Sequence, residues 1–384
     1  MSFFGDGVYF ITINWLIIEL YKSTLALGSV AAISAIPNLL IIPFIGVLID
    51  RYARKYLVLS ADLIRGILVA VLALIIGMNK FNIIVLYPIN IIIGVCAAMY
   101  AIGYNALISD LVEKKDLTKF FSVMTIIYQS GYLLGSTLAG FIIYKIGITG
   151  ALTVDSISFI CSAICISLIP SKSKLIVKNI EYIEKKGYFG SMKEGLMLLK
   201  RQKKLIIIMI LSMPIMVFIS IINIVEPAFV SKVLNGSASD FGFIDAALGI
   251  GAIIGAFIVR YINKRGKEGT FLWLGYLLLG ISLVSFSLTR SVYSALIING
   301  LVGLAYIITS IIYQSYMQNL TDNSIIGRVT SVQRFLQNIC LPVVLMAVGY
   351  LGEVVNYIIL IRFLAIFYVF IFIVSCFLLK NKEI

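Results

Sequence analysis

The sequence has no histidine and little charge, and both absences narrow the functions open to it. Only 13% of its 384 residues are charged and 61% are hydrophobic, whereas soluble domains are roughly 25% charged and 45–50% apolar. It also shows no ATP-binding loop of the form G-x-x-x-x-G-K-S/T, no Ser-Lys catalytic motif and no paired intramembrane aspartate motif. An enzyme is therefore the least expected class, and we predict no catalytic residue and no cofactor.

Cysteine is scarce and gives no sign of a disulfide or a metal site. All five cysteines fall inside apolar segments, at Cys96, Cys161, Cys165, Cys340 and Cys376. In such surroundings cysteine behaves as a small buried hydrophobe. Cys161 and Cys165 share a helix face, yet the chain offers neither histidine nor a second thiol pair nearby to complete a zinc site. We predict no metal.

Long apolar runs are abundant, and a spanning helix needs about 20 predominantly apolar residues. Runs such as 67–76 do not alternate apolar with polar residues, which favours helices over barrel strands. The first run begins at Phe3 without a basic leader, unlike a cleavable signal peptide. We predict an all-α integral membrane protein with twelve transmembrane helices in two six-helix bundles. The predicted spans are 3–21, 25–50, 56–78, 81–108, 117–144, 148–169, 205–230, 241–262, 270–288, 291–318, 326–350 and 354–379.

The net charge of +13 is explained by topology rather than by a nucleic-acid partner. With both termini in the cytoplasm, twenty-four of the 31 Lys and Arg residues fall in inside loops and five in outside connections. Such a bias sets the orientation of a membrane protein. We predict a multi-pass plasma membrane protein with both termini cytoplasmic. Anionic membrane lipids are its expected partners, nucleic acid is not, and we expect a monomer.

The one long polar stretch divides the chain into two halves. We predict an N-terminal bundle over 1–170, a basic cytoplasmic linker over 171–204 and a C-terminal bundle over 205–384. Apolar residues recur at helical spacing from Phe189 to Leu199, which suits a helix on the membrane surface, and a simple solvated linker is the alternative. A shift of 209 residues aligns polar and glycine positions of the two halves. The aligned pairs include Asn14 with Asn223, Gly46 with Gly255, Arg51 with Arg260, Lys55 with Lys264, Asn90 with Asn299 and Gly140 with Gly349. Two related halves are typical of secondary transporters.

The loop after the second predicted span carries a specific motif. Residues 46–55 read GVLIDRYARK and resemble the G-x-x-x-D-R-x-x-R-K signature of the major facilitator superfamily. Residues 5–7, 62–65 and 155–159 also resemble this family, on the branch that contains macrolide-efflux and siderophore-export proteins. The resemblance covers the whole chain. It implies a transporter of small molecules in which the loop docks near Ile326 and gates the transport cycle. The gating set it implies is Gly46, Asp50, Arg51, Arg54, Lys55 and Asp110.

Elementary electrostatics is consistent with a switching role for this loop. Asp50 falls at a helix C-terminus, where the helix dipole disfavours an anion by about 0.3–1 kcal/mol. Compensation is expected from Arg51 or Arg54, with Asp110 completing the charge cluster. The second half has Val259 where the first has Asp50, so only the first half can form the acidic contact. The alternative is that the basic residues only fix topology.

The fifth predicted span contains Gly131, Gly135 and Gly140, which let helices approach closely. The pattern resembles a drug-antiporter motif, but Ser136 stands where that motif has proline, and ordinary close packing explains the glycines equally well. Asn90 stands where the family's proton-coupling pattern has an arginine. Proton coupling would therefore have to use other groups.

Charges inside the spans are the remaining clue, because each costs roughly 2.5–3.5 kcal/mol at mid-helix. We expect one carboxylate to pair with Arg362, and the others to carry a proton or bind a cationic substrate. Asp6 and Glu226 are favoured, and Asn14 and Asn223 are candidates for hydrogen bonds to substrate. Alternatively, Asp6 is simply hydrated near the cytoplasmic interface, and Glu19 and Asp245 are hydrated in the same way on the outer side. The charged residues considered are Asp6, Glu19, Asp155, Glu226, Asp245 and Arg362, all but Asp6 in the outer third of their spans.

The sequence therefore predicts a secondary active transporter. We expect an ion-coupled exporter, with the proton as the coupling ion, of small amphipathic compounds such as drugs or macrolides. The alternatives are an importer and a transporter of a specific solute, siderophore or lipid. A non-transporting sensor would want a large soluble domain, which the chain lacks.

Overall fold

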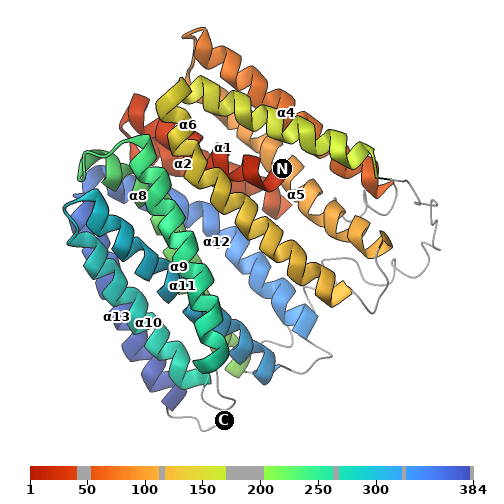
Figure 1. The fold of residues 1–384 in the computed structure, drawn as a ribbon. Coiled ribbons are helices and arrows are strands. Elements are labelled where there is room, and N and C mark those ends of the chain that lie inside the picture. Colours follow the sequence, from red (N-terminus) through yellow and green to blue (C-terminus); the bar gives the residue numbers. More distant parts are fainter. Residues whose placement is uncertain (41–52, 112–116, 170–202, 263–267, 322–325, 381–384) are drawn as a thin grey trace. The chain divides into compact units, whose positions relative to one another are not determined.

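A computed structural model describes residues 1–40, 53–111, 117–169, 203–262, 268–321 and 326–380 (Figure 1). All the regular secondary structure of these residues is helical. Ten of the described helices are long and apolar enough to cross a membrane, and the helix over Thr24–Pro37 is apolar but shorter. The predicted all-helical membrane fold is confirmed. The count of twelve spans and the two six-helix bundles stay predictions.

The described helices form two compact units. The first contains α1, α2 from Ser29 onward, α4, α5, α6 and the first turn of α9, and the second contains the rest of the helical chain. The helices of the first unit are α1 Ser2–Tyr21, α2 Thr24–Leu40, α4 Arg54–Gly77, α5 Ile83–Leu111 and α6 Leu117–Ser167. The later helices are α8 Lys203–Lys232, α9 Ala238–Ile262, α10 Glu268–Ser287, α11 Val292–Leu320, α12 Ile326–Val354 and α13 Tyr357–Lys380. The predicted domain boundaries stay predictions, because most of the linker lies outside the described residues.

The helix boundaries repeat with the offset found in the sequence. Helix α11 begins and ends 209 residues after α5. Packing repeats as well, because α4 lies against α5 and α6, and its counterpart α10 lies against α11 and α13. The two halves therefore share one local architecture.

Helix α6 contains two of the predicted spans. Its 51 residues are interrupted at Gly147, which has φ +74° and ψ 176°. This conformation costs little only for glycine, which has no Cβ. The predicted spans 117–144 and 148–169 thus meet at a backbone break rather than at a loop, and the second of them carries Asp155.

The helices bury aromatic residues against one another and turn other apolar residues outward. Phe218, Phe229 and Tyr276 are fully buried in the second unit, whereas Leu74 and Ile297 are each 65% exposed. Outward apolar faces of this extent are unfavourable in water and suit lipid. They identify a multi-pass membrane protein.

Candidate functional site: a buried ion cluster at the first helix

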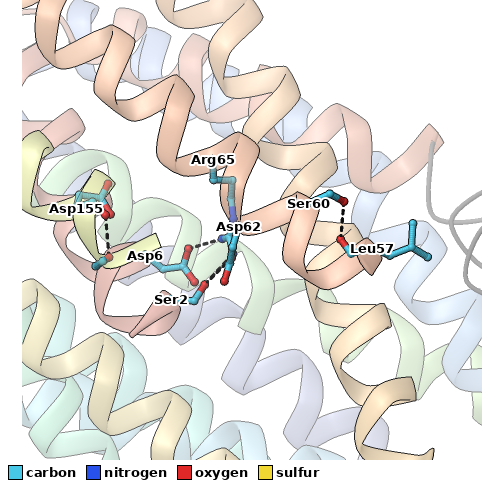
Figure 2. A network of polar contacts seen from close by, with 8 residues as sticks. Ser2, Asp6, Leu57, Ser60, Asp62, Arg65 and Asp155 are labelled. Carbon is cyan, nitrogen blue, oxygen red and sulfur yellow. Dashed lines mark hydrogen bonds and ion pairs between the residues drawn. The ribbon is translucent and has the colours of Figure 1, made fainter. Parts of the chain in front are cut away.

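An ion cluster joins the first turns of α1 to the middle of α4 (Figure 2). Arg65 Nη1 contacts Asp6 Oδ1 at 2.9 Å, and Arg65 Nη2 donates to Ser2 Oγ at 2.7 Å. Arg65 also pairs with Asp62, one turn earlier on α4. Ser2 Oγ donates to Asp62 Oδ1 at 3.0 Å. Two carboxylates and a hydroxyl therefore share one guanidinium.

Two aromatic rings lie against this guanidinium. Arg65 Cζ lies 4.3 Å from the centroid of the Phe159 ring and 5.0 Å from that of Tyr100. Both are within the range of cation–π attraction. Arg65 is 1% exposed and Asp62 is 0% exposed, whereas the Asp6 side chain is 35% exposed. Asp6 is thus the accessible member of an otherwise buried set.

Asp155 on α6 adds a third carboxylate. It is fully buried, and neither carboxylate oxygen has a hydrogen-bond partner among the described residues. A Cβ placed on Gly5 would lie 2.6 Å from Asp155 Oδ1, so the carboxylate packs directly against the α1 backbone. Asp155 is also close enough to Asp6 and Arg65 for their charges to interact. A buried charge without a donor is very costly, whereas the same group carrying a proton costs far less.

Further polar side chains lie along α1 past the cluster. Tyr9 Oη donates to Asn90 Oδ1 at 3.2 Å, and Asn90 Nδ2 donates to the Leu86 carbonyl at 2.9 Å. Further along, Thr12 Oγ1 and Asn14 Nδ2 are buried and have no hydrogen-bond partner within the described chain. The first helix thus presents polar groups that could receive a ligand, and Asn14 is among them.

A second polar centre lies in the second unit. Glu226 on α8 is 2% exposed, and Asn299 Nδ2 on α11 donates to Glu226 Oε1 at 3.1 Å. Asp245 on α9 is partly buried and interacts electrostatically with Glu226. Asn223 is partly buried one turn before Glu226 on the same helix. The structure therefore brings Glu226, Asp245 and Asn299 together.

Most of the predicted gating set falls outside the described residues. Gly46, Asp50 and Arg51 lie within 41–52, and the Asp110 side chain is likewise not described. Arg54 Nη1 donates to the Ala106 carbonyl at 2.9 Å. Lys55 Nζ donates to the carbonyls of Ser167 and Ile169 at 2.7 and 2.6 Å, where it neutralises the C-terminal end of α6. The gating role stays a prediction.

The glycines of α6 lie at close helix contacts. A Cβ on Gly135 would overlap the Phe4 carbonyl oxygen, and one on Gly131 would lie 3.2 Å from Phe3 Cβ. A Cβ on Gly140 would lie 2.5 Å from the Ala238 carbonyl oxygen. Two of these positions let α6 approach α1 next to the ion cluster.

Two expectations about intramembrane charges are corrected. Arg362 is exposed, and its contact among the described residues is a hydrogen bond from Nε to Ser287 Oγ at 3.4 Å, not a carboxylate. From the sequence we expected Asp155, like Glu19, in the outer third of its own span. The structure places it beside Gly5, at the other end of α1 from Glu19. Hydropathy locates a span in the sequence, but it fixes neither the level of a residue relative to neighbouring helices nor which faces meet.

Sequence reasoning missed the residues that complete both centres. Asp62 and Arg65 were noted only as part of a family resemblance, and Asn299 only as a repeat position. The spacing of Asp62 and Arg65 was an available signal, because residues three apart share a helix face and can pair. The aromatic enclosure by Tyr100 and Phe159 had no signal in the sequence. Among the described residues, no group of three or more Cys, Asp or Glu side chains could hold a metal ion.

The sequence matches a known family over most of its length. The sequence model described as Major Facilitator Superfamily matches residues 1–344. The multidrug efflux pump Tap of Mycolicibacterium fortuitum is 23% identical, over 91% of this chain and 86% of that protein. Macrolide efflux protein A of Streptococcus pyogenes is 19% identical, over 89% of this chain and 84% of that protein. The staphyloferrin A transporter of Staphylococcus aureus is 24% identical, over 74% of this chain and 70% of that protein.

Solved structures share the fold at low sequence identity. The nucleoside transporter NupG has a TM-score of 0.72 and 12% identity, and the alignment covers 99% of this chain and 96% of that one. A bacterial homologue of the iron transporter ferroportin has a TM-score of 0.75 and 14% identity, and the alignment covers 97% of this chain and 95% of that one. At this identity the similarity establishes the architecture.

Proposed function

The chain belongs to the Major Facilitator Superfamily, and from that premise we propose that it is an ion-coupled exporter of small amphipathic compounds. The names of two relatives, a multidrug efflux pump and a macrolide efflux protein, support the direction and the substrate class. Transport would proceed by alternating access between two six-helix bundles built from twelve spans. The same proposal includes a monomer in the plasma membrane, with cytoplasmic termini and anionic lipid neighbours.

The observation that carries ion coupling is the unpartnered carboxylate of Asp155. Arg65 pairs with two carboxylates, those of Asp6 and Asp62, and Asp155 lies nearby without a hydrogen-bond partner among the described residues, so full ionisation leaves excess negative charge in a buried place. A proton on Asp155 removes the most poorly compensated charge. Asp6, which is partly exposed, is the route by which a proton reaches the cluster. Loading and release of this proton would bias the packing of α1 against α6.

The loop over 46–55 would act as the gate in this scheme. Asp50, Arg51, Arg54 and Asp110 would form and break contacts as the conformation changes, with Gly46 allowing the close approach. The bonds of Arg54 and Lys55 to carbonyls of the first unit support an anchored base for the loop. Asn14 and Asn223 would offer hydrogen bonds to the substrate.

A transport assay with purified protein in proteoliposomes tests the coupling. Asp155→Asn keeps the shape of the side chain and removes its charge and its proton. We expect efflux of an amphipathic dye driven by a proton gradient to be lost, while exchange of dye across the membrane without a gradient persists. Glu19→Gln removes an exposed carboxylate from the same unit and is the matched control, expected to behave as wild type. Gradient-driven efflux by Asp155→Asn at the wild-type rate would rule out this coupling site.

A specific solute is the second candidate, favoured by the similarity to the staphyloferrin A transporter. A siderophore or lipid transporter of this fold would carry one compound class and ignore chemically unrelated dyes. An export assay with dyes of different structure distinguishes an exporter of many amphipathic compounds from a transporter of one solute. Export of several unrelated amphipathic dyes supports the proposal, and export of none from folded protein favours the specific transporter.

A further inference from the structure

The second polar centre contains more hydrogen-bond acceptors than donors. Asn299 is fully buried, and its Nδ2 donates both to Glu226 Oε1 at 3.1 Å and to the Ile244 carbonyl at 2.8 Å. Its Oδ1 is buried and has no donor within the described part of the chain. Buried polar atoms are nearly always hydrogen-bonded in native proteins, so an orphan acceptor requires an explanation.

A proline adds another acceptor at the same level. Pro227 lies inside α8 and has no N–H, so the carbonyl of Asn223 lacks its usual helical donor. The side chain of a helical residue covers the turn on its N-terminal side. The Glu226 carboxylate therefore lies over the turn that exposes the Asn223 carbonyl.

Asp245 supplies the access to this centre. It follows Ile244, whose carbonyl is bound by Asn299, and it is close enough to Glu226 for their charges to interact. Asp245 is partly exposed, whereas Glu226 and Asn299 are buried. A ligand reaching Asp245 first would pass inward to the two buried groups. Two carboxylates and an orphan amide oxygen call for a positive charge that carries several N–H donors.

The scaffold around Asn299 is closely packed. A Cβ on Gly303 of α11 would overlap the Leu248 carbonyl oxygen, and one on Gly251 of α9 would overlap the Gly300 carbonyl oxygen. Helices that meet backbone to backbone hold the side chains at their contact in a fixed geometry. The orphan oxygen is therefore part of a built site rather than a product of loose packing.

We infer that Glu226, Asp245 and Asn299 bind the protonated amino group of a cationic amphipathic substrate. An alkylammonium carries three N–H donors on one nitrogen, which match the three side-chain acceptors. The inference rests on the proposed exporter function, and it separates two duties. The Asp6–Arg65 cluster already contains its own cation and serves the coupling ion, whereas the second unit receives the substrate.

Binding of a fluorescent amine to purified protein in detergent tests the assignment. The probe is monodansylcadaverine, a primary amine on an apolar dye. Its N-acetylated form has the same dye but no charged amino group, and it serves as the control ligand. Glu226→Gln, Asp245→Asn and Asn299→Ala should each weaken binding of the amine about tenfold or more, because each removes a bond to a charged group. The acetylated probe should bind weakly to every form, and Glu19→Gln should bind both probes as wild type does.

Three results would overturn the inference. The first is equal affinity of the wild type for the amine and its acetylated form. The second is wild-type affinity for the amine in both Glu226→Gln and Asp245→Asn, in protein whose folding is verified by thermal unfolding. If Glu226→Gln does not fold, Asp245→Asn still provides the test, because Asp245 is only partly buried. The third is displacement of the probe by NaCl but not by KCl, which would indicate a sodium site. Asp155→Asn should retain probe binding, so a failure of the coupling proposal remains distinguishable from a failure of this one.

Discussion

The two units bury polar groups at repeat-related positions by different means. In the first unit, Phe159 packs on the guanidinium of Arg65, which holds two carboxylates. Tyr368 stands 209 residues after Phe159, and its Oη donates to the Pro214 carbonyl at 2.6 Å. Pro214 is in turn the counterpart of Gly5, which packs against Asp155. One place in the repeated bundle thus contains ions in the first unit and a neutral phenol in the second.

This difference indicates what the ions are for. In the second unit, Tyr276 makes a similar bond from its phenol to the Leu211 carbonyl, and the same helix, α8, is held by two neutral contacts. Such bonds stabilise by about 1 kcal/mol each and carry little desolvation cost. A buried ion pair is often no more stabilising than apolar packing. Since the fold can be held without ions at this place, the cluster of the first unit is better explained by function than by packing.

The repeat-related asparagines show the reverse arrangement. Asn90 accepts from the phenol of Tyr9, whereas Asn299 donates to the carboxylate of Glu226. The asparagine of the first unit thus contacts a neutral phenol, and that of the second contacts an acidic group. Within the described residues each unit therefore has an ionisable centre of its own, at a different position of the shared architecture, as expected if one unit handles the coupling ion and the other the substrate.

The largest expected effect comes from removing the cation of the first unit. Arg65→Met leaves Asp6 and Asp62 without their guanidinium, and removing one partner of a buried ion pair costs about 3–5 kcal/mol. Thermal unfolding in detergent should show a large fall in Tm. Neutralising Asp6 and Asp62 as well, both to Asn, should restore part of the loss because the unpaired charges are then gone.

Arg362→Met is the matched control for this prediction. Arg362 is exposed and contacts Ser287 through one long hydrogen bond of 3.4 Å. Exposed polar contacts contribute roughly 0–1 kcal/mol, so Tm should change little. Equal losses from the two arginine variants would contradict the distinction between a buried cluster and an exposed cation.

The sequence predicted the helices well because lipid imposes a length and an apolar composition on them. The predicted span 291–318 compares with α11 at Val292–Leu320, and 270–288 compares with α10 at Glu268–Ser287. The break at Gly147 was also anticipated as the boundary between two spans. These features depend on local composition, which a single sequence contains in full.

The candidate site was predicted only in part because its geometry depends on which helix faces meet. Asp6 and Asp155 could be picked out as costly intramembrane charges, but their shared neighbour Arg65 comes from α4. Arg362 looked equally significant in sequence and is exposed in the structure. Burial and partner choice are tertiary properties, and hydropathy along the chain does not encode them.

A smaller loss is expected from closing the glycine contact that is specific to the first unit. Gly135→Ala introduces a Cβ that overlaps the Phe4 carbonyl, and the same two helices are also in close contact at Gly7, where a Cβ would lie 2.4 Å from the Tyr132 carbonyl oxygen. Overpacking of this kind costs about 1–3 kcal/mol, measured as Tm of the purified protein. Val344→Ala, 209 residues later, removes partly buried apolar atoms and should cost about 1 kcal/mol or less. A Gly135→Ala protein as stable as wild type would show that the helices separate easily.

Removing a neutral contact of the second unit should lower stability less than the Gly135→Ala substitution does. Tyr368→Phe removes the hydrogen bond to the Pro214 carbonyl but keeps the ring in its edge contact with Phe218, at 5.4 Å between centroids. Stability should fall by about 1 kcal/mol, and gradient-driven efflux should be as sensitive to an uncoupler as in wild type. The contrast is with Asp155→Asn, which should affect coupling. Loss of coupling in Tyr368→Phe would mean that the tyrosines also take part in ion movement.

The smallest effect separates the two asparagines. Asn90→Ala removes the acceptor of a 3.2 Å bond from Tyr9 Oη and should cost about 0.5–1 kcal/mol of stability. It should leave the affinity for monodansylcadaverine unchanged, whereas Asn299→Ala should weaken it. Fluorescence titration of the two variants side by side measures the difference. Equal weakening by both would mean that the repeated asparagines act alike, and the substrate contact would then have to be shared between the units instead of belonging to the acidic centre of the second.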